Sequence, residues 1–333
     1  SISVSQGGTD LGSLNDLNMP SATLSFAFLD EFFGTDPLAL ENLFLTEDWI
    51  FNGNNDAQVL TADMLTDDGF SYSPSGNDTA FLMGGDDIFD LGLGNDTIFG
   101  GTGRDQLFGG AGDDILNGGG AKDIIHGGAG NDIMHGGSDD DIMHGESGRD
   151  IMYGDGGDDI MFGGTSGGTD SMYGGEGNDQ LNGGNQRDKL WGGAGDDTLN
   201  GDLGNDIMFG GDGEDILNGG TGNDRMFGGA GDNVFNGGTG DDRMYAGDDA
   251  DTFVFNSITN TGDDDVYGYD TAEDTLDING TSFLGINIFA DHVVVSHSGG
   301  TITLNDLTIS NIAEYNAMIN SFDTSFDDPF AVG

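Results

Sequence analysis

The most constraining feature of the sequence is an aspartate that returns every nine residues through its middle part. Nineteen of twenty successive positions hold Asp, and Asn233 fills the other one. A two-residue insertion within 163–168 interrupts the spacing once. Glycine usually occupies places one, two and four of each unit, where it permits positive φ angles and close approach of backbones. A short repeat of this kind predicts a solenoid, in which each unit stacks on its neighbours.

The units resemble the repeats-in-toxin (RTX) family, whose consensus is G-G-x-G-x-D-x-U-x, with U an apolar residue. Complete copies include 127-GGAGNDIMH and 219-GGTGNDRMF, and the resemblance covers about 180 of the 333 residues. It implies an all-β solenoid, a right-handed parallel β-roll of about ten 18-residue coils. Small mixed N-terminal and C-terminal regions would cap the roll. In each unit the first six residues turn and the last three form a strand, so two units complete one coil.

Side-chain alternation assigns an inside and an outside to each strand. Place eight is apolar in every unit from Phe89 to Phe253, and it is Met eight times. We therefore expect place eight to fill a narrow core, which the adaptable Met side chain suits. Places seven and nine point outward.

The repeated aspartates are the candidate metal ligands. They are Asp78, Asp87, Asp96, Asp105, Asp114, Asp123, Asp132, Asp141, Asp150, Asp159, Asp170, Asp179, Asp188, Asp197, Asp206, Asp215, Asp224, Asp242 and Asp251. In successive coils, carboxylates about 5 Å apart repel each other unless a cation lies between them. The RTX resemblance implies one Ca²⁺ between successive turns, held by two Asp and by turn carbonyls, with at most about 18 ions. The alternative is a merely solvated acidic edge.

Some units depart from the pattern, and we expect weak or missing calcium sites there. Ala121 and Lys122 precede Asp123, and Arg187 precedes Asp188. Asn233 lacks the charge, and the 163–168 insertion enlarges one turn.

The charge balance restricts the partners of the chain. Asp and Glu number 61 against 7 Lys and Arg, which gives a formal net charge of −54. This excludes a nucleic-acid binder, which needs clustered cations, and disfavours docking on anionic lipid. So much like charge keeps a chain expanded until a cation neutralises it. The absence of Cys excludes disulfides and thiolate metal sites.

Three regions are expected. Residues 1–72 would form an N-terminal capping or interaction region, with strands at 22–29 and 48–51 and a short helix around 37–46. Residues 73–254 would form the roll. Residues 255–333 would form a C-terminal cap, in which 249–278 looks like the roll-closing segment of secreted RTX proteins. A hairpin over 292–304 and an amphipathic helix over 311–322 would follow.

Targeting features suggest an extracellular protein. No apolar run approaches the ~20 residues of a membrane helix. The N-terminus shows neither a basic n-region nor an apolar h-region, so secretion without an N-terminal signal peptide is expected. The tail, 321–333, is similar to the uncleaved C-terminal signals that a type I secretion apparatus reads.

The outward place nine carries two contrasting rows. One sheet presents an aromatic row, which is a candidate interaction face: Tyr153, Tyr173, Trp191, Phe209, Phe227 and Tyr245. The other sheet carries a row of Asn. Exposed apolar patches mark interaction sites, but cross-strand stacking alone would also explain the row. His126 and His144 lie one coil apart, where they would either bind a transition metal or serve as outward spacers.

Enzyme signatures are absent from the sequence. There is no H-E-x-x-H, and 145-GESGR lacks the last Gly of G-x-S-x-G. We therefore expect a non-enzymatic, calcium-binding extracellular structural protein that folds on Ca²⁺ after export. Self-assembly would make it a homo-oligomer or polymer, such as a filament, surface layer or matrix. The alternatives are the calcium-dependent secretion and folding tail of a secreted hydrolase, or an adhesive carbohydrate- or surface-binding module.

Overall fold

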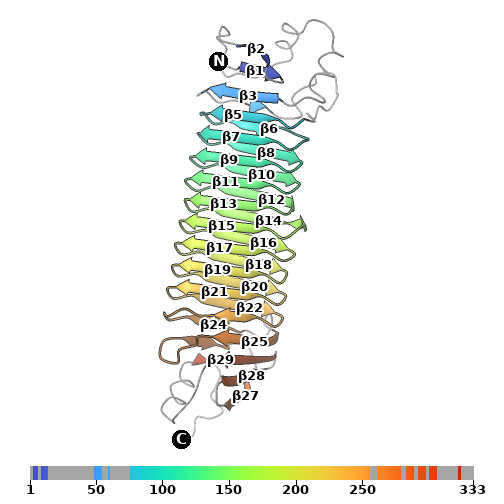
Figure 1. The fold of residues 1–333 in the computed structure, drawn as a ribbon. Coiled ribbons are helices and arrows are strands. Elements are labelled where there is room, and N and C mark those ends of the chain that lie inside the picture. Colours follow the sequence, from blue (N-terminus) through green and yellow to red (C-terminus); the bar gives the residue numbers. More distant parts are fainter. Residues whose placement is uncertain are drawn as a thin grey trace. The chain divides into compact units, whose positions relative to one another are not determined.

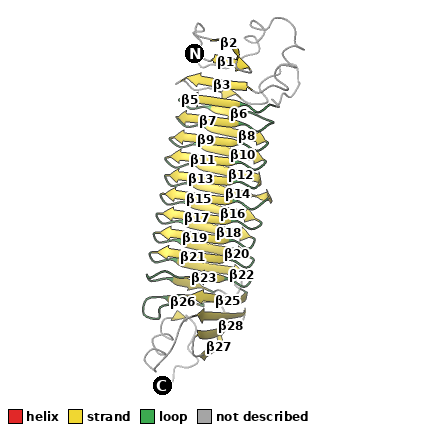
Figure 2. Ribbon diagram, in the orientation of Figure 1, coloured by secondary structure: helices red, strands yellow, loops and turns green. Residues whose placement is uncertain are grey.

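The computed structural model describes residues 3–6, 9–13, 49–54, 59–60, 76–255, 261–278, 283–288, 292–297, 300–305 and 322–323. These residues form strands joined by turns and bends, and no helix occurs among them (Figures 1 and 2). The chain forms two compact units, Ser1–Ser171 and Met172–Gly333. Both are parallel β-solenoids, and together they hold about ten turns.

Two parallel sheets form the first unit. One contains β3 (Trp49–Asn54), β5 (Thr79–Met83), β7 (Thr97–Thr102), β9 (Ile115–Gly120), β11 (Ile133–Ser138) and β13 (Ile151–Gly156). The other contains β4 (Val59–Leu60), β6 (Ile88–Asp90), β8 (Gln106–Ala111), β10 (Ile124–Ala129), β12 (Ile142–Gly148) and β14 (Ile160–Gly167). Before them, β1 (Ser3–Gln6) pairs antiparallel with β2 (Thr9–Ser13) and with β3.

The second unit repeats this arrangement. One sheet contains β17 (Lys189–Ala194), β19 (Ile207–Asp212), β21 (Arg225–Ala230), β23 (Arg243–Tyr245) and β25 (Gly262–Tyr267), all parallel. The other contains β16 (Gln180–Asn185), β18 (Thr198–Leu203), β20 (Ile216–Thr221), β22 (Val234–Thr239), β24 (Thr252–Val254), β26 (Thr275–Asp277) and β30 (Phe322–Asp323). The strand β15 (Ser171–Glu176) begins at the last residue of the first unit.

Three further strands extend the first of these sheets. β29 (Gly300–Asn305) pairs in parallel with β25. β28 (His292–His297) pairs antiparallel with β29, and β27 (Phe283–Ile288) pairs antiparallel with β28. The antiparallel pair β28–β29 confirms the predicted hairpin over 292–304.

The register places like residues on top of one another. Ile125 on β10 lies opposite Leu107 on one side and Met143 on the other, each 18 residues away. All the place-eight side chains from Ile98 to Phe253 are fully buried. This confirms the predicted core. The two-residue insertion shifts the register of β12 and β14 between Glu146 and Ser147, and it lengthens β14.

The turns and the ends of the strands require glycine because successive coils lie in close contact. Gly222, at place four, has a φ of +129°, and a Cβ atom there would lie 1.3 Å from the carbonyl oxygen of Gly204. Gly119, at place two, has a φ of +109°, and its Cβ would lie 2.2 Å from the carbonyl oxygen of Gly101. Only glycine combines this conformation with this approach.

Other expectations from the sequence have different outcomes. The strand β3 confirms the strand predicted at 48–51. The strand predicted at 22–29, the helix predicted at 37–46 and residues 311–321 of the helix predicted at 311–322 lie outside the described residues. Phe322, the last residue of that predicted helix, lies in the strand β30 instead. The boundaries 1–72, 73–254 and 255–333 stay predictions.

Over the part of the chain that the structure describes, no helix is long and apolar enough to cross a membrane.

Candidate metal-binding edges

The repeated aspartates lie at the turns between the two sheets, and their side chains are buried. Every one of the nineteen has at most 3% of its surface exposed. Asp132, Asp206 and Asp215, for example, have none exposed. The place-six carboxylates therefore do not form a solvated acidic edge.

One hydrogen bond repeats from coil to coil at these aspartates. The backbone N–H of Asp96 donates to Oδ1 of Asp114 over 2.7 Å, and that of Asp123 donates to Oδ1 of Asp141 over 2.7 Å. We call each resulting series an Asp ladder. Each coil thus fixes the carboxylate of the next one by its backbone. Across the insertion, Asp150 still donates to Oδ1 of Asp170, over 2.8 Å.

The second carboxylate oxygen is the unusual atom of this arrangement. Among the described residues, the Oδ2 atom is buried without a hydrogen-bond partner in Asp105, Asp114, Asp123, Asp132, Asp141, Asp150, Asp197, Asp206, Asp215, Asp224, Asp242 and Asp264. Burying an ionised oxygen without a compensating partner is costly, and native proteins avoid it. Such atoms recur along both edges, which indicates that a species other than the protein chain satisfies them.

Asn233 shows what the structure does where the charge is missing. Its Oδ1 accepts the N–H of Asp215 over 3.0 Å, as an Asp would. Its Nδ2 donates to the carbonyl oxygen of Gly231 over 2.9 Å. Both polar atoms of the Asn233 side chain thus have hydrogen-bond partners within the protein, without a cation. A carboxylate oxygen at that position cannot donate, so beside turn carbonyls it needs a proton or a cation.

The pKa values of the ladder carboxyl groups reflect the cost of burying their ionised form. Burial, reinforced by carboxylates of neighbouring coils, raises the pKa of Asp114 and Asp123 to about 7. The same causes raise the pKa of Asp141 to about 8 and that of Asp197 to about 7. The folded chain therefore favours a neutralised form of each carboxylate near neutral pH.

The donor set suits calcium. Ca²⁺ takes six to eight oxygen ligands in flexible geometry, from carboxylates, carbonyls and water. Two stacked Asp offer unsatisfied oxygens, and the surrounding turns offer carbonyls. No group of three or more His, Cys, Asp or Glu suited to a metal is present in the described ranges. Two Asp carboxylates cannot fill six to eight positions, so backbone carbonyls and water would have to supply the rest of the coordination.

One departure from the repeat leaves the geometry intact. Ala121 adopts a φ of +78°, and the exposed ammonium of Lys122 contacts Asp140 rather than the Asp ladder. Asp123 stays buried, and its backbone still donates to Asp141. The weak sites expected at the irregular units stay predictions.

Two residues of the Asp ladders were not predicted from the sequence. Asp264 accepts the N–H of Asp242, and Asp274 accepts that of Asp251, each over 2.9 Å. Their spacings are 22 and 23 residues instead of 18. A usable signal is 261-TGDD, which repeats 239-TGDD of the previous coil.

The outward aromatic side chains of the second unit form one stack. Ring centroids are 4.4 Å apart for Tyr173–Trp191, 5.6 Å for Trp191–Phe209, 4.7 Å for Phe209–Phe227, 4.5 Å for Phe227–Tyr245 and 4.7 Å for Tyr245–Tyr267. Tyr267 was not expected in this row. Tyr153, in the first unit, stacks on His135 at 4.6 Å.

Basic side chains gather beside this stack. Lys189, Arg225 and Arg243 are exposed at place seven of β17, β21 and β23. They are three of the seven Lys and Arg of the whole chain. The two arginines lie opposite each other on adjacent strands. Arg225 lies over Phe227, at 5.6 Å, and Nε of Arg243 lies 3.7 Å from Asp265.

The remaining outward rows also stack. His126 and His144 are parallel, 4.7 Å apart, and Nδ1 of His126 lies 3.0 Å from Glu146. On the other sheet of the second unit, Asn200 donates to Asn182 over 2.9 Å. The metal role left open for the histidines stays a prediction.

Comparison with known families accounts for the repeats. The profile described as "RTX calcium-binding nonapeptide repeat (4 copies)" matches residues 75–98, 99–134, 135–166, 165–199, 182–217, 191–226 and 218–253. These matches together span more than half of the chain. The chain belongs to the RTX calcium-binding nonapeptide repeat family. RTX repeats bind calcium and form β-rolls; their repeat domains are typically non-catalytic, and the proteins that carry them are typically secreted.

Solved structures show similarity at low identity. The AlgE6R3 subunit of the mannuronan C5-epimerase from Azotobacter vinelandii is 20% identical, with a TM-score of 0.27, and the match covers 45% of this chain and 84% of that one. The extracellular lipase LipA from Serratia marcescens is 21% identical, with a TM-score of 0.24. That match covers 59% of this chain and 39% of the lipase. No curated protein matches.

Proposed function

We propose that this chain is a non-enzymatic extracellular structural protein that folds on calcium after export and assembles with further copies of itself. The carrying observation is the buried Oδ2 atom of ladder residues such as Asp114, Asp141 and Asp215, which has no hydrogen-bond partner among the described residues. Calcium held between Asp of successive coils would satisfy these atoms. Up to about 18 ions would be held in this way, one between each pair of stacked turns.

The mechanism is coupled metal binding and folding. Where calcium is scarce, a net charge of −54 and unneutralised carboxylates favour the expanded chain. An expanded chain suits passage through a type I secretion apparatus. Where calcium is millimolar, ions that bind the folded form alone supply folding free energy.

Self-assembly is supported by the outer faces of the first unit. Place seven is Ile115, Ile133 and Ile151 on one sheet, and the exposed fraction of Ile115 is 43%. On the other sheet, Phe162 has 38% of its surface exposed. Apolar patches of this kind mark interaction sites. Two such faces on one unit would allow each copy to contact two neighbours and form an open array.

Electron microscopy in millimolar calcium and in chelator tests this proposal. Ordered filaments or sheets that form only with calcium are expected. The variant Ile133→Asn, Ile151→Asn should abolish them while calcium-dependent folding persists. Thr198→Asn, Thr252→Asn is the matched control, because it adds two amides to place seven of the second unit. If the wild type folds in calcium but its particles stay isolated, the assembly part of the proposal is wrong, whereas calcium-dependent folding is not contradicted.

A second candidate function is adhesion to an acidic polysaccharide. It is favoured by the gathering of Lys189, Arg225 and Arg243 beside the aromatic stack. In a chain this acidic, three exposed cations on one sheet are a local exception. Like charges opposite each other on neighbouring strands are destabilising, and Arg243 already lies near Asp265, so Arg225 in particular would gain from a bound anion. Aromatic ring edges are also electropositive.

Affinity electrophoresis in gels containing carboxymethylcellulose tests adhesion, with neutral hydroxyethylcellulose as the reference polymer. Retardation by the acidic polymer alone is expected, and Lys189→Gln, Arg225→Gln, Arg243→Gln should remove it. The matched control is Arg104→Gln, Lys122→Gln, Arg149→Gln, which removes the same charges from turns of the first unit. Equal retardation of both triple variants would contradict this role for the aromatic face.

A further inference from the structure

The turn that precedes β25 belongs to a further coil, which lies beyond the residues that the family profile matches. The profile match ends at residue 253. Beyond it, Gly240 donates to the carbonyl oxygen of Thr261 over 2.7 Å, and Thr261 donates to that of Gly238 over 3.0 Å. β25 then pairs with β23 in the register of the preceding strands. The 261-TGDD turn thus repeats the backbone of 239-TGDD, although the two glycines that open a regular unit are missing.

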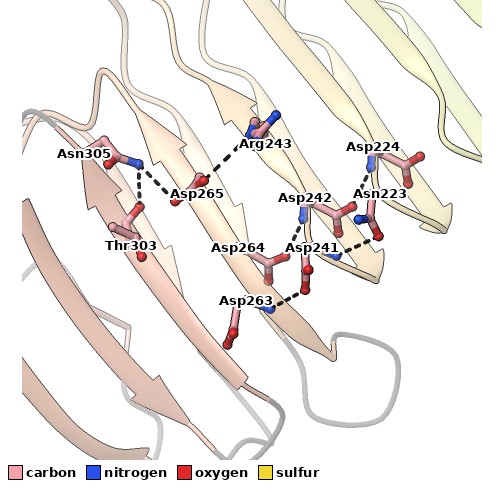
Figure 3. A network of polar contacts seen from close by, with 10 residues as sticks. All are labelled: Asn223, Asp224, Asp241, Asp242, Arg243, Asp263, Asp264, Asp265, Thr303 and Asn305. Carbon is pink, nitrogen blue, oxygen red and sulfur yellow. Dashed lines mark hydrogen bonds and ion pairs between the residues drawn. The ribbon is translucent and has the colours of Figure 1, made fainter.

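Asp264 occupies the ladder position of this turn (Figure 3). Its Oδ1 accepts the N–H of Asp242 over 2.9 Å, just as Asp242 accepts that of Asp224 over 2.8 Å. Both Asp242 and Asp264 have 1% of their surface exposed. Within the described residues, the Oδ2 atoms of both are buried and make no hydrogen bond. Two buried carboxylates therefore lie one above the other with one oxygen each unsatisfied.

Further negative charge surrounds this pair. Asp263 donates its N–H to Oδ1 of Asp241 over 3.0 Å, and both side chains are exposed at the same turns (Figure 3). Burial and the charges of Asp242, Asp241 and Asp263 raise the pKa of Asp264 to about 8. Nothing described at this turn supplies a positive charge to Asp264.

The opposite edge ends differently, and the contrast identifies the site. There the last ladder pair is Asp251 and Asp274. Oδ2 of Asp251 accepts the N–H of Gly247 over 3.0 Å, and Oδ2 of Asp274 accepts that of Asp270 over 2.7 Å. Backbone N–H groups thus supply a hydrogen bond to each of these two Oδ2 atoms, which lowers the need for a cation at this pair. Within the described part of the chain, the Oδ2 atoms of Asp242 and Asp264 accept no such hydrogen bond.

We propose that Asp242, within the matched repeats, and Asp264, beyond them, form a calcium site that attaches the C-terminal strands to the roll. β25 pairs with β23 on one side and with β29 on the other, and β28 and β27 follow β29. An ion at this turn holds β25 against β23. It thereby makes the ordering of β27, β28 and β29 depend on calcium. The inference rests on the proposed calcium-dependent folding.

Hydrogen exchange of the full-length chain across a calcium titration tests the site. In Asp264→Asn, the calcium concentration that protects β28 and β29 should rise at least tenfold, while the midpoint for β19 and β21 stays unchanged. Asn233 indicates that an amide keeps the ladder fold. Asp274→Asn is the matched control on the other edge and should shift neither midpoint.

The outcomes separate this site from the general proposal. If no wild-type strand gains protection with calcium, the proposed function fails. If β19 and β21 depend on calcium but β28 and β29 respond equally in the wild type and Asp264→Asn, only the Asp242–Asp264 site fails. Loss of protection throughout Asp264→Asn, or the same shift in Asp274→Asn, would also overturn it.

Discussion

At the residue scale, folding depends on one carboxylate oxygen atom in most repeats. Oδ1 of each ladder Asp belongs to the backbone hydrogen bond that orients the side chain. In residues such as Asp114 and Asp141, Oδ2 is the atom that a cation or a proton must satisfy. The difference between Asp and Asn at this atom is a difference between accepting and donating, which is why Asn233 can close its turn without an ion.

Asn233→Asp should add one calcium ion to the stoichiometry. The substitution places an unsatisfied oxygen next to that of Asp215, where the amide now donates to Gly231. Equilibrium dialysis with metal analysis measures the change. Asn223→Asp adds the same charge to an exposed turn position and should leave the stoichiometry unchanged. An unchanged stoichiometry in Asn233→Asp would contradict the two-Asp site.

Acidification in chelator should partly replace calcium. Burial raises the folded-state pKa of Asp132 to about 6, of Asp150 to about 7 and of Asp141 to about 8. A raised pKa means that the metal-free fold binds more protons than the unfolded chain. Its stabilisation is therefore fully present below about pH 4 and is lost as the pH rises through 6 to 8.

Circular dichroism at low protein concentration, from pH 4 to pH 8, measures this effect. Calcium needs the ionised carboxylates, so its affinity should change in the opposite direction and fall as the pH drops through the same window. Calcium binding at pH 7 should also release protons, which a pH-stat detects. Metal-free structure that grows as the pH rises from 4 to 8 would contradict the assignment.

At the element scale, each coil depends on glycines that look alike in sequence but differ in role. At Gly119 the backbone is left-handed and the coil before it leaves no room for a Cβ. At the adjacent Gly120 the nearest atom to a new Cβ is Oγ of Ser138 at 3.4 Å, an ordinary contact. Gly119 is therefore required for the contact between coils, whereas Gly120 has room for a side chain.

Gly119→Ala should therefore destabilise the roll, whereas Gly120→Ala should not. The first change combines a strained conformation with a clash against Gly101, so a loss of more than about 2 kcal/mol is expected. The second should stay within about 0.5 kcal/mol. Thermal unfolding in saturating calcium compares the two variants. Equal melting temperatures would show that the coils can shift apart at little cost.

The repeat predicted the turn aspartates and the inward positions, because a strict period fixes them together. The strand length was wrong: β10 (Ile124–Ala129) and β21 (Arg225–Ala230) have six residues instead of three, because places one to three of the next unit also pair with neighbouring coils. Its limits appear where the period breaks. Asp264 and Asp274 were missed because insertions change their spacing, although their backbone contacts are the same. The closure of Asp274 by the N–H of Asp270 was equally invisible, since it depends on the shape of one irregular turn. The predicted hairpin was found because β-alternation does not depend on the repeat.

For the whole molecule, charge decides between the expanded and the folded chain. The formal net charge of the chain is −54, and at most about 18 calcium ions would remove up to about 36 of these charges. In chelator, small-angle scattering should give a radius of gyration of about 65 Å or more, the scale of an unfolded chain of this length. Calcium should reduce the radius sharply, in parallel with the appearance of β structure by circular dichroism.

The choice of cation separates site-specific binding from charge screening. Sodium chloride at matched ionic strength screens charges between exposed groups but does not supply ligand-bound charge within a turn. Magnesium keeps its waters and demands octahedral geometry, so turn carbonyls and two stacked Asp suit it poorly. Compaction by calcium alone is therefore expected. If magnesium or sodium chloride compacts the chain to the same extent as calcium, general charge neutralisation is sufficient for compaction. The Asp ladders would then not be specific calcium-binding sites.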